Sequence, residues 1–208
     1  LLKLGLTDTV ALMFDVFLSL IFFIQHSVIV RKSFRRFIVH HMPEIYIGAV
    51  YAISSGIALF IVLLFWQETA GSVGTAQGLF RFFLRLFFAA SIVGFYWGTR
   101  ALGHFDPLGI RVIVLHLQGK KPKEMPLAIR GPYRYVRHAL YLFMLLIIWS
   151  NPDLTLDRLL FNILWTVWIY VGTVFEERDL IADFGESYKR YQEKVPMLIP
   201  RRLSRYSD

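Results

Sequence analysis

The sequence predicts an all-α polytopic membrane protein. Of its 208 residues, 56% are hydrophobic and only 18% are charged, against roughly a quarter in soluble domains. Aromatic residues make up 16% of the chain, and the apolar residues gather in long runs. This composition excludes a disordered chain and an ordinary soluble domain.

Charge and cysteine usage narrow the class further. The net charge of +8 is expected to mark cytoplasmic loops of a membrane protein, and it predicts no nucleic-acid partner. Because the sequence contains no cysteine, it excludes disulfides, thiolate metal sites and a cysteine nucleophile.

Apolar runs predict about five membrane segments, since a spanning helix needs about 20 apolar residues. They cover residues 10–30, 45–66, 79–102, 139–149 and 159–175. The fourth run is short, and only a few residues separate it from the fifth. These last two segments are therefore expected to form a helical hairpin that need not cross the whole bilayer. Gly94 and Gly98 give the third segment a small-residue face for close packing.

Basic and non-basic connections alternate along the chain. The 31–44 connection holds four Lys or Arg residues, and the 103–138 connection holds seven. By contrast, the 67–78 connection holds none and the 150–158 connection holds one. The tail from Glu177 again holds seven. The positive-inside rule therefore predicts that the C-terminus lies in the cytoplasm.

Several polar residues lie inside or beside the predicted spans. Asp15 is either a functional intramembrane acid or the partner of a neighbouring helix. Gln25 and His26 either bond to the 103–111 connection or form a polar helix end at the interface. Arg81 is expected to extend toward lipid headgroups.

The chain is expected to be one integral-membrane domain over residues 1–208. Residues 1–102 would supply segments one to three, and residues 103–208 the catalytic region with segments four and five. The 103–138 connection and the 177–208 tail have no hydrophobic run long enough for a core of their own. We therefore expect them to pack on each other and cap the bundle.

The densest polar cluster lies at the cytoplasmic ends of segments four and five. One block is the run GPYRYVRHALY at residues 131–141, and the other is EERD at residues 176–179. A helical hairpin brings the two blocks to one membrane face. They could form a pocket for a zwitterionic, partly aromatic cofactor. The alternative is an interface belt of Tyr and Arg anchors with intrahelical ion pairs.

These two blocks, with the FG..Y..Y and VPMLIP patterns that follow, resemble the isoprenylcysteine carboxyl methyltransferase superfamily of integral-membrane methyltransferases. Two further runs, FIQHS at residues 23–27 and GHFDPLGIR at residues 103–111, resemble its methanethiol S-methyltransferase branch. Together the resemblance covers nearly the whole chain. Members of that branch often carry one more apolar segment upstream.

The resemblance implies an enzyme that uses S-adenosylmethionine, bound in a cytoplasmic pocket roofed by the C-terminal segment. The branch methylates small volatile thiols, methanethiol to dimethyl sulfide and sulfide to methanethiol. Glu176 and Glu177 would face the cofactor's positive charges or the substrate, with Arg178 beside them. The implied cofactor-binding residues are Tyr133, Arg137, His138, Tyr141, Glu176, Tyr191, Pro196 and Leu198.

The sequence departs from the family pattern at two positions. Ala139 replaces the usual proline after His138, which should loosen the start of the helix because proline is pre-organised for a first turn. Phe143 stands where glycine is common and could narrow a close approach between helix and cofactor.

Methyl transfer to a thiol needs the thiolate, because a neutral thiol is a weak nucleophile. A base or a positive field must therefore act on the thiol. The candidates are His104, Arg111, His138, Arg178 and the Glu176–Glu177 pair. Neighbouring helix residues lie about 100° apart, so only one glutamate should face the pocket. We favour Glu177 or its neighbour, with Arg178, near the cofactor, and His104 or Arg111 near the thiol; no metal is expected.

The sequence is also compatible with other functions. Within enzymes, the rivals are methylation of a prenyl-cysteine carboxylate or of another lipophilic acceptor such as a phospholipid amine. Outside enzymes, the chain could be a nurim-like membrane scaffold, although such a relic would be free to lose the acidic block. The expected partners are the thiol and membrane lipids, with no obligate protein partner.

Overall fold

The computed structural model describes residues 1–103, 106, 108–120 and 126–200. Helices dominate this described part, and its only strands form a short two-stranded sheet. The chain divides into two compact units. The first comprises Leu1–Gly71 and Asp106–Glu124, and the second comprises Ser72–Phe105 and Met125–Asp208. The expectation of a single 1–208 domain stays a prediction.

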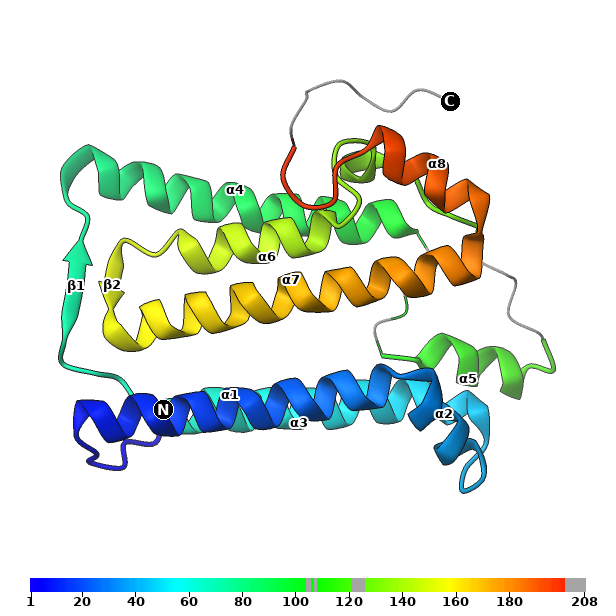
Figure 1. The fold of residues 1–208 in the computed structure, drawn as a ribbon, viewed down its shortest axis with the longest axis horizontal. Coiled ribbons are helices and arrows are strands. Elements are labelled where there is room, and N and C mark those ends of the chain that lie inside the picture. The colour runs from blue at the N-terminus through cyan, green and yellow to red at the C-terminus, as the bar shows by residue number, and fades with distance from the viewer. Residues whose placement is uncertain (104–105, 107, 121–125, 201–208) are drawn as a thin grey trace. The chain divides into compact units, whose positions relative to one another are not determined.

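The first unit is built on two long antiparallel helices that lie side by side (Figure 1). Its elements are α1 (Asp8–Val30), α2 (Lys32–Val39), η1 (Glu44–Tyr46), α3 (Ile47–Phe65) and α5 (Ile110–Leu117). Gly109 sits directly against the backbone of Gly48, where an added Cβ would come within 2.5 Å of backbone atoms. The glycine pair therefore lets the start of α5 lie against the start of α3.

Asp15 ties the end of α3 to α1. The Asp15 side chain is fully buried, and its Oδ1 accepts a 3.0 Å hydrogen bond from the backbone N–H of Gln67. The Gln67 amide in turn accepts from the N–H of Leu4 and donates to the carbonyl of Leu2. Of the two interpretations of Asp15, the structure therefore supports pairing with a neighbouring segment.

At the other end of this hairpin, Gln25 and His26 bond to α3. The Gln25 amide donates to the Ser54 hydroxyl at 3.2 Å, and the Tyr51 hydroxyl bonds to Nε2 of His26 at 2.8 Å. These bonds hold both side chains against α3; the expected contact with the 103–111 connection, part of which lies outside the described residues, stays a prediction.

The second unit packs three helices beside one another, with α6 between α4 and α7 (Figure 1). Its elements are β1 (Ser72–Thr75), α4 (Gly78–Leu102), η2 (Gly131–Arg134), α6 (Ala139–Trp149), β2 (Asp153–Thr155), α7 (Leu156–Phe184) and α8 (Glu186–Lys194). Helices α6 and α7 form the predicted hairpin.

The predicted small-residue face of α4 is confirmed. A Cβ at Gly94 would lie 2.3 Å from Cε1 of Phe143, and one at Gly98 would lie 2.8 Å from Cδ2 of Leu140. The side chains of α6 therefore fill the space left by the missing methyl groups. The Phe143 ring therefore packs against α4, while its expected effect on a cofactor's approach stays a prediction.

The strands β1 and β2 were not predicted. They pair antiparallel, with Ser72 opposite Thr155 and Thr75 opposite Asp153. The guanidinium of Arg81 donates to both carboxylate oxygens of Asp153, at 2.7 and 2.6 Å. Arg81 thus pairs with Asp153 where we had expected it to extend toward lipid, and the pair joins the start of α4 to β2.

In the part of the chain that the structure describes, four helices are long and apolar enough to cross a membrane: α1, η1 with α3, α4 and α7. The 11-residue α6 is apolar but shorter. Large hydrophobic side chains such as Phe82, Phe83 and Leu86 are exposed along α4, as expected for a lipid-facing surface. These features confirm an all-α polytopic fold and fit a membrane protein.

Candidate functional site

The first wall of the site is the tight turn η2, which precedes α6 in the chain. Gly131 has φ +56°, a conformation that glycine adopts without strain. An added Cβ there would also lie 2.8 Å from the Ala101 side chain. Pro132 and Tyr133 follow and are buried, so the chain is fixed where it delivers Arg137 and His138 to the start of α6.

The second wall is the C-terminal segment. The backbone N–H groups of Arg137 and His138 donate to the carbonyls of Pro196 and Met197, at 3.0 and 3.1 Å. These bonds fix the residues just before α6, and Ala139 is fully buried there. The start of α6 is therefore held by the C-terminal segment without the family's proline.

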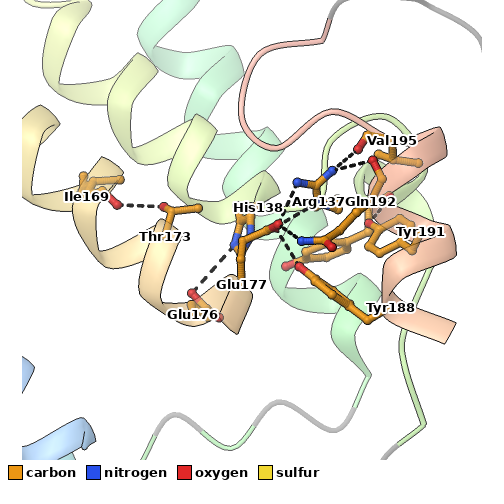
Figure 2. Close-up of polar contacts among 11 residues, drawn as sticks. Arg137, His138, Ile169, Thr173, Glu176, Glu177, Tyr188, Tyr191, Gln192 and Val195 are labelled. Atoms are coloured by element: carbon orange, nitrogen blue, oxygen red, sulfur yellow. Dashed lines mark hydrogen bonds and ion pairs between the residues drawn. The ribbon is translucent and has the colours of Figure 1, made fainter. Parts of the chain in front are cut away.

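Glu177 is the centre of the polar network (Figure 2). Its Oε1 accepts from Arg137 Nε at 2.8 Å, His138 Nε2 at 2.7 Å and the Tyr188 hydroxyl at 2.8 Å. Its Oε2 accepts from Arg137 Nη2 at 2.8 Å and from the Gln192 amide. The Glu177 and Arg137 side chains are only about a tenth exposed, at 10% and 9%. This is a buried, bidentate, charge-assisted pair.

Arg137 also holds the C-terminal segment directly. Its Nη1 donates to the carbonyl of Gln192 at 3.0 Å and to the carbonyl of Val195. The guanidinium therefore donates to a carboxylate and to backbone carbonyls at the C-terminal end of α8 at the same time. The planar fork of Arg allows this, and the single ammonium of Lys does not.

His138 lies between the two glutamates. Its Nε2 contacts Glu177, and its Nδ1 is 3.7 Å from Oε2 of Glu176. The ring of Tyr141 stacks on the imidazole, with centroids 5.7 Å apart and planes 7° apart. The imidazole is therefore fixed on one edge and one face, and its Nδ1 edge points to Glu176 (Figure 2).

A small aromatic core closes the site from the C-terminal side. Tyr188, Tyr191 and Val195 are buried against Leu127, Ile129, Leu180, Ile181 and Phe184. The Tyr191 hydroxyl donates to the carbonyl of Tyr133. This cluster of α8 and the segment that follows, residues 186–198, is called the cap below. It confirms that the 103–138 connection and the tail pack on each other.

Burial keeps two phenols of this region protonated. Burial, helped by the negative charge of Glu176, raises the pKa of Tyr133 above its usual range. Burial, together with the hydrogen bond to Glu177 and its charge, raises the pKa of Tyr188 as well. Tyr188 therefore remains a hydrogen-bond donor to Glu177 at neutral pH.

The structure brings all the predicted cofactor-binding residues into one unit. They are Tyr133, Arg137, His138, Tyr141, Glu176, Tyr191, Pro196 and Leu198, together with Glu177. Arg178 lies outside the network: it is exposed, and its guanidinium lies 5.4 Å from the centroid of the Phe175 ring. Arg111 belongs to the other unit, in the first turn of α5, and its N–H donates to Asp106. His104 lies outside the described residues.

Sequence reasoning missed two residues, Tyr188 and Gln192, which both donate to Glu177. The FG..Y..Y pattern contained Tyr188, and Gln192 follows it by four residues on the same face of α8. Their spacing is a usable signal, but it predicts a contact only once α8 is known to fold back on α7. Across the residues that the structure describes, no cluster of His, Cys, Asp and Glu could hold a metal ion.

The chain is 35% identical to a methanethiol S-methyltransferase from a Pseudomonas species over 205 residues, covering 95% of this chain and 76% of that protein. It is also 35% identical to a methanethiol S-methyltransferase of Crocosphaera subtropica over 193 residues, covering 91% of this chain and 75% of that protein. The chain belongs to the methanethiol S-methyltransferase family. It is accordingly a methyltransferase enzyme.

More distant relatives bear another name. The nurim of Rattus norvegicus is 24% identical over 182 residues, covering 82% of this chain and 68% of that protein. Because this identity is lower than that to the methyltransferases, the match does not favour a membrane scaffold over an enzyme. No family model matches the chain, and no solved structure matches it.

Proposed function

We propose that the protein transfers a methyl group from S-adenosylmethionine to methanethiol, giving dimethyl sulfide, and that sulfide is a second acceptor. The observation that carries this proposal is the name of the relatives, which align with 91–95% of the chain. The buried network around Glu177 supports it, because it lies where the family resemblance predicts a donor pocket.

The residues of this network fit a positively charged methyl donor. Arg137 and Glu177 compensate each other's charge, so Glu176 remains as the uncompensated negative charge beside His138 and Tyr141. A carboxylate and an aromatic face suit a sulfonium or ammonium group. When bound, S-adenosylmethionine would supply a methyl group already activated by a positive sulfur, so the chain would need no covalent nucleophile.

We assign the proposed roles by contact. His138, Tyr141 and Glu176 would line the donor pocket, with Pro196 and Leu198 of the cap closing it. Arg137, Tyr133 and Tyr191 would act by holding the cap in place. Since water weakens both positioning and electrostatics, a closed cap would favour transfer. His104 and Arg111 stay as proposed groups on the thiol side, and Arg178 as a proposed source of positive field.

The test is headspace gas chromatography of the purified protein in detergent, supplied with S-adenosylmethionine and methanethiol. We expect dimethyl sulfide whose formation requires the protein and both substrates. Omission of each component in turn is the control. Binding of the donor by calorimetry without any dimethyl sulfide would mean that the acceptor is not methanethiol.

We further propose that the C-terminus and the site face the cytoplasm, as the distribution of basic residues indicates. The cysteine-free sequence gives a clean test. A single cysteine in place of Lys189, an exposed residue of α8, should react with a membrane-impermeant maleimide in inverted vesicles. Reaction in intact cells instead would reverse the orientation.

A further inference from the structure

The two adjacent glutamates of α7 differ in their capacity to accept a proton. Glu177 receives hydrogen bonds from five donor groups, and a carboxylate has about four lone-pair sites. Protonation of Glu177 would therefore require it to release donors and break its buried pair with Arg137. Glu177 is occupied in holding the site together and is not available as a base.

Glu176 is in the opposite state. Its Oε2 is buried and has no hydrogen-bond partner in the described part of the chain, although it lies 3.7 Å from Nδ1 of His138. Because Nε2 of His138 donates to the Glu177 carboxylate, a neutral imidazole carries its lone pair on Nδ1. Two acceptors thus face each other with no proton between them.

From this arrangement we propose that Glu176 Oε2 and His138 Nδ1 together accept the proton of the thiol. The inference rests on the proposed function and assigns the base that the sequence left open. A thiol S–H placed beside the pair would satisfy two acceptors that otherwise lack a donor. A buried acceptor without a donor is unfavourable, so the site is arranged to receive one.

In the proposed step, the thiol gives its proton to the pair and its sulfur takes the methyl group. The S–H bond breaks, and its electron pair stays on the sulfur, which forms the new bond to the methyl carbon. That carbon gives up its bond to the donor sulfur, which keeps the electron pair and becomes neutral. The proton is held between Nδ1 and Oε2. Because the Glu176 side chain is 43% exposed, the proton has a short route to water.

The surrounding charges support proton acceptance at this pair. A protonated His138 would lie between the carboxylates of Glu176 and Glu177, while the charge of Arg137 is already matched by Glu177. The other titratable groups that face the pair from this unit are the phenols of Tyr133, Tyr141 and Tyr188. Burial raises the pKa of Tyr133 and Tyr188, so these two phenols stay neutral.

The experiment compares Glu176→Gln with the parent on two acceptors, methanethiol and a thiol acidified by an electron-withdrawing group so that it is ionised at the assay pH. For methanethiol we expect kcat of the variant to fall about 100-fold or more at neutral pH. The rate should then recover about tenfold per pH unit on the alkaline side, as the free thiolate replaces the missing base. At saturating donor, kcat for the acidified thiol should stay close to that of the parent.

Asp179→Asn is the matched control, because it removes one carboxylate from the same stretch of α7 without touching the pair; its rates should equal the parent's. Equal loss of kcat on both thiols at saturating donor, or a change confined to donor affinity by calorimetry, would overturn the inference and leave Glu176 with only its proposed place beside the donor's charge. A parent protein that methylates neither thiol would instead overturn the proposed function, and the inference with it.

Discussion

Replacing Glu177 by Gln should release the cap. Two cap groups, the Tyr188 hydroxyl and the Gln192 amide, donate directly to this carboxylate. Arg137, which holds the carbonyls of Gln192 and Val195, is itself held by it. The substitution therefore weakens the hydrogen bonds from the cap to Glu177 and also the position of Arg137, which binds the cap.

The magnitude follows from the burial of the pair. Removing one partner of a buried ion pair costs about 3–5 kcal/mol, because the other charge is left uncompensated. Even the lower figure, at about 1.4 kcal/mol per factor of ten, raises the population with an open cap by about 100-fold. Tyr188→Phe removes one hydrogen bond to a charged group, about 1.5 kcal/mol, and should raise the same population about tenfold.

The assay uses the absence of native cysteine. Leu198 is 8% exposed in the closed cap, so a cysteine in its place should react with a maleimide only when the cap opens. When opening is fast relative to labelling, the labelling rate tracks the open population. We expect the order parent, Tyr188→Phe, Glu177→Gln, from slowest to fastest.

The control is Glu176→Gln in the same cysteine background. It removes the neighbouring carboxylate, which makes no hydrogen bond to the cap, and should leave the labelling rate unchanged. Equal labelling of Glu177→Gln and the parent would refute the reasoning that this carboxylate holds the cap.

Two further predictions concern stability in detergent. Gly94→Ala places a methyl group against the Phe143 ring and should destabilise the protein by about 1–3 kcal/mol. Gly172→Ala, where an added Cβ meets nothing within 4 Å, should be neutral or slightly stabilising. Thermal unfolding midpoints check both variants, and equal midpoints would contradict the packing argument. The hydrogen bonds from Arg81, helped by its charge and those of Arg158 and Arg85, hold the pKa of Asp153 below its usual range, so the pair stabilises the fold above that range and is lost as the pH falls through the lowered pKa. The thermal unfolding midpoint of the parent should therefore exceed that of Asp153→Asn by less below about pH 4 than at neutral pH. A difference that stays constant with pH would contradict a stabilising role for the pair.

Hydropathy was sufficient for the membrane helices because a buried or lipid-facing helix must be apolar along its whole length. The predicted run 139–149 coincides with α6, whose end is fixed by Asn151 and Pro152. The predicted end of the last helix at residue 175 was too early. Helix α7 continues to Phe184, and its last turns are charged and amphipathic, so hydropathy cannot detect them.

Contacts between distant residues could not be predicted from the sequence. Asp15 and Gln67 are 52 residues apart, and neither residue type specifies the other. The β1–β2 pair likewise joins short segments without an alternating pattern, such as Ser72–Thr75. Their pairing depends on α4, α6 and α7 already lying side by side.

In the site, too, the sequence does not determine which of two adjacent residues is buried. Helical geometry predicted that only one of Glu176 and Glu177 would face the pocket. Glu177 is the more buried of the two, yet both reach the His138 ring. Which glutamate is the more buried depends on the rotation of α7 about its axis, and Ile169 and Thr173 on its buried face set that rotation. By helical period either glutamate could lie at the edge of that buried face, so the sequence does not say which of the two is more buried.

The network joins closure of the cap to the state of His138. The carboxylate that receives the Nε2 proton of His138 is also the one that holds Tyr188 and Gln192. When the cap detaches, Glu177 loses the donors Tyr188 and Gln192, and Arg137 loses the carbonyls of Gln192 and Val195. The contact that fixes the Nε2 proton of His138 is then weaker, so the proposed base is best held in its competent form while the cap is closed.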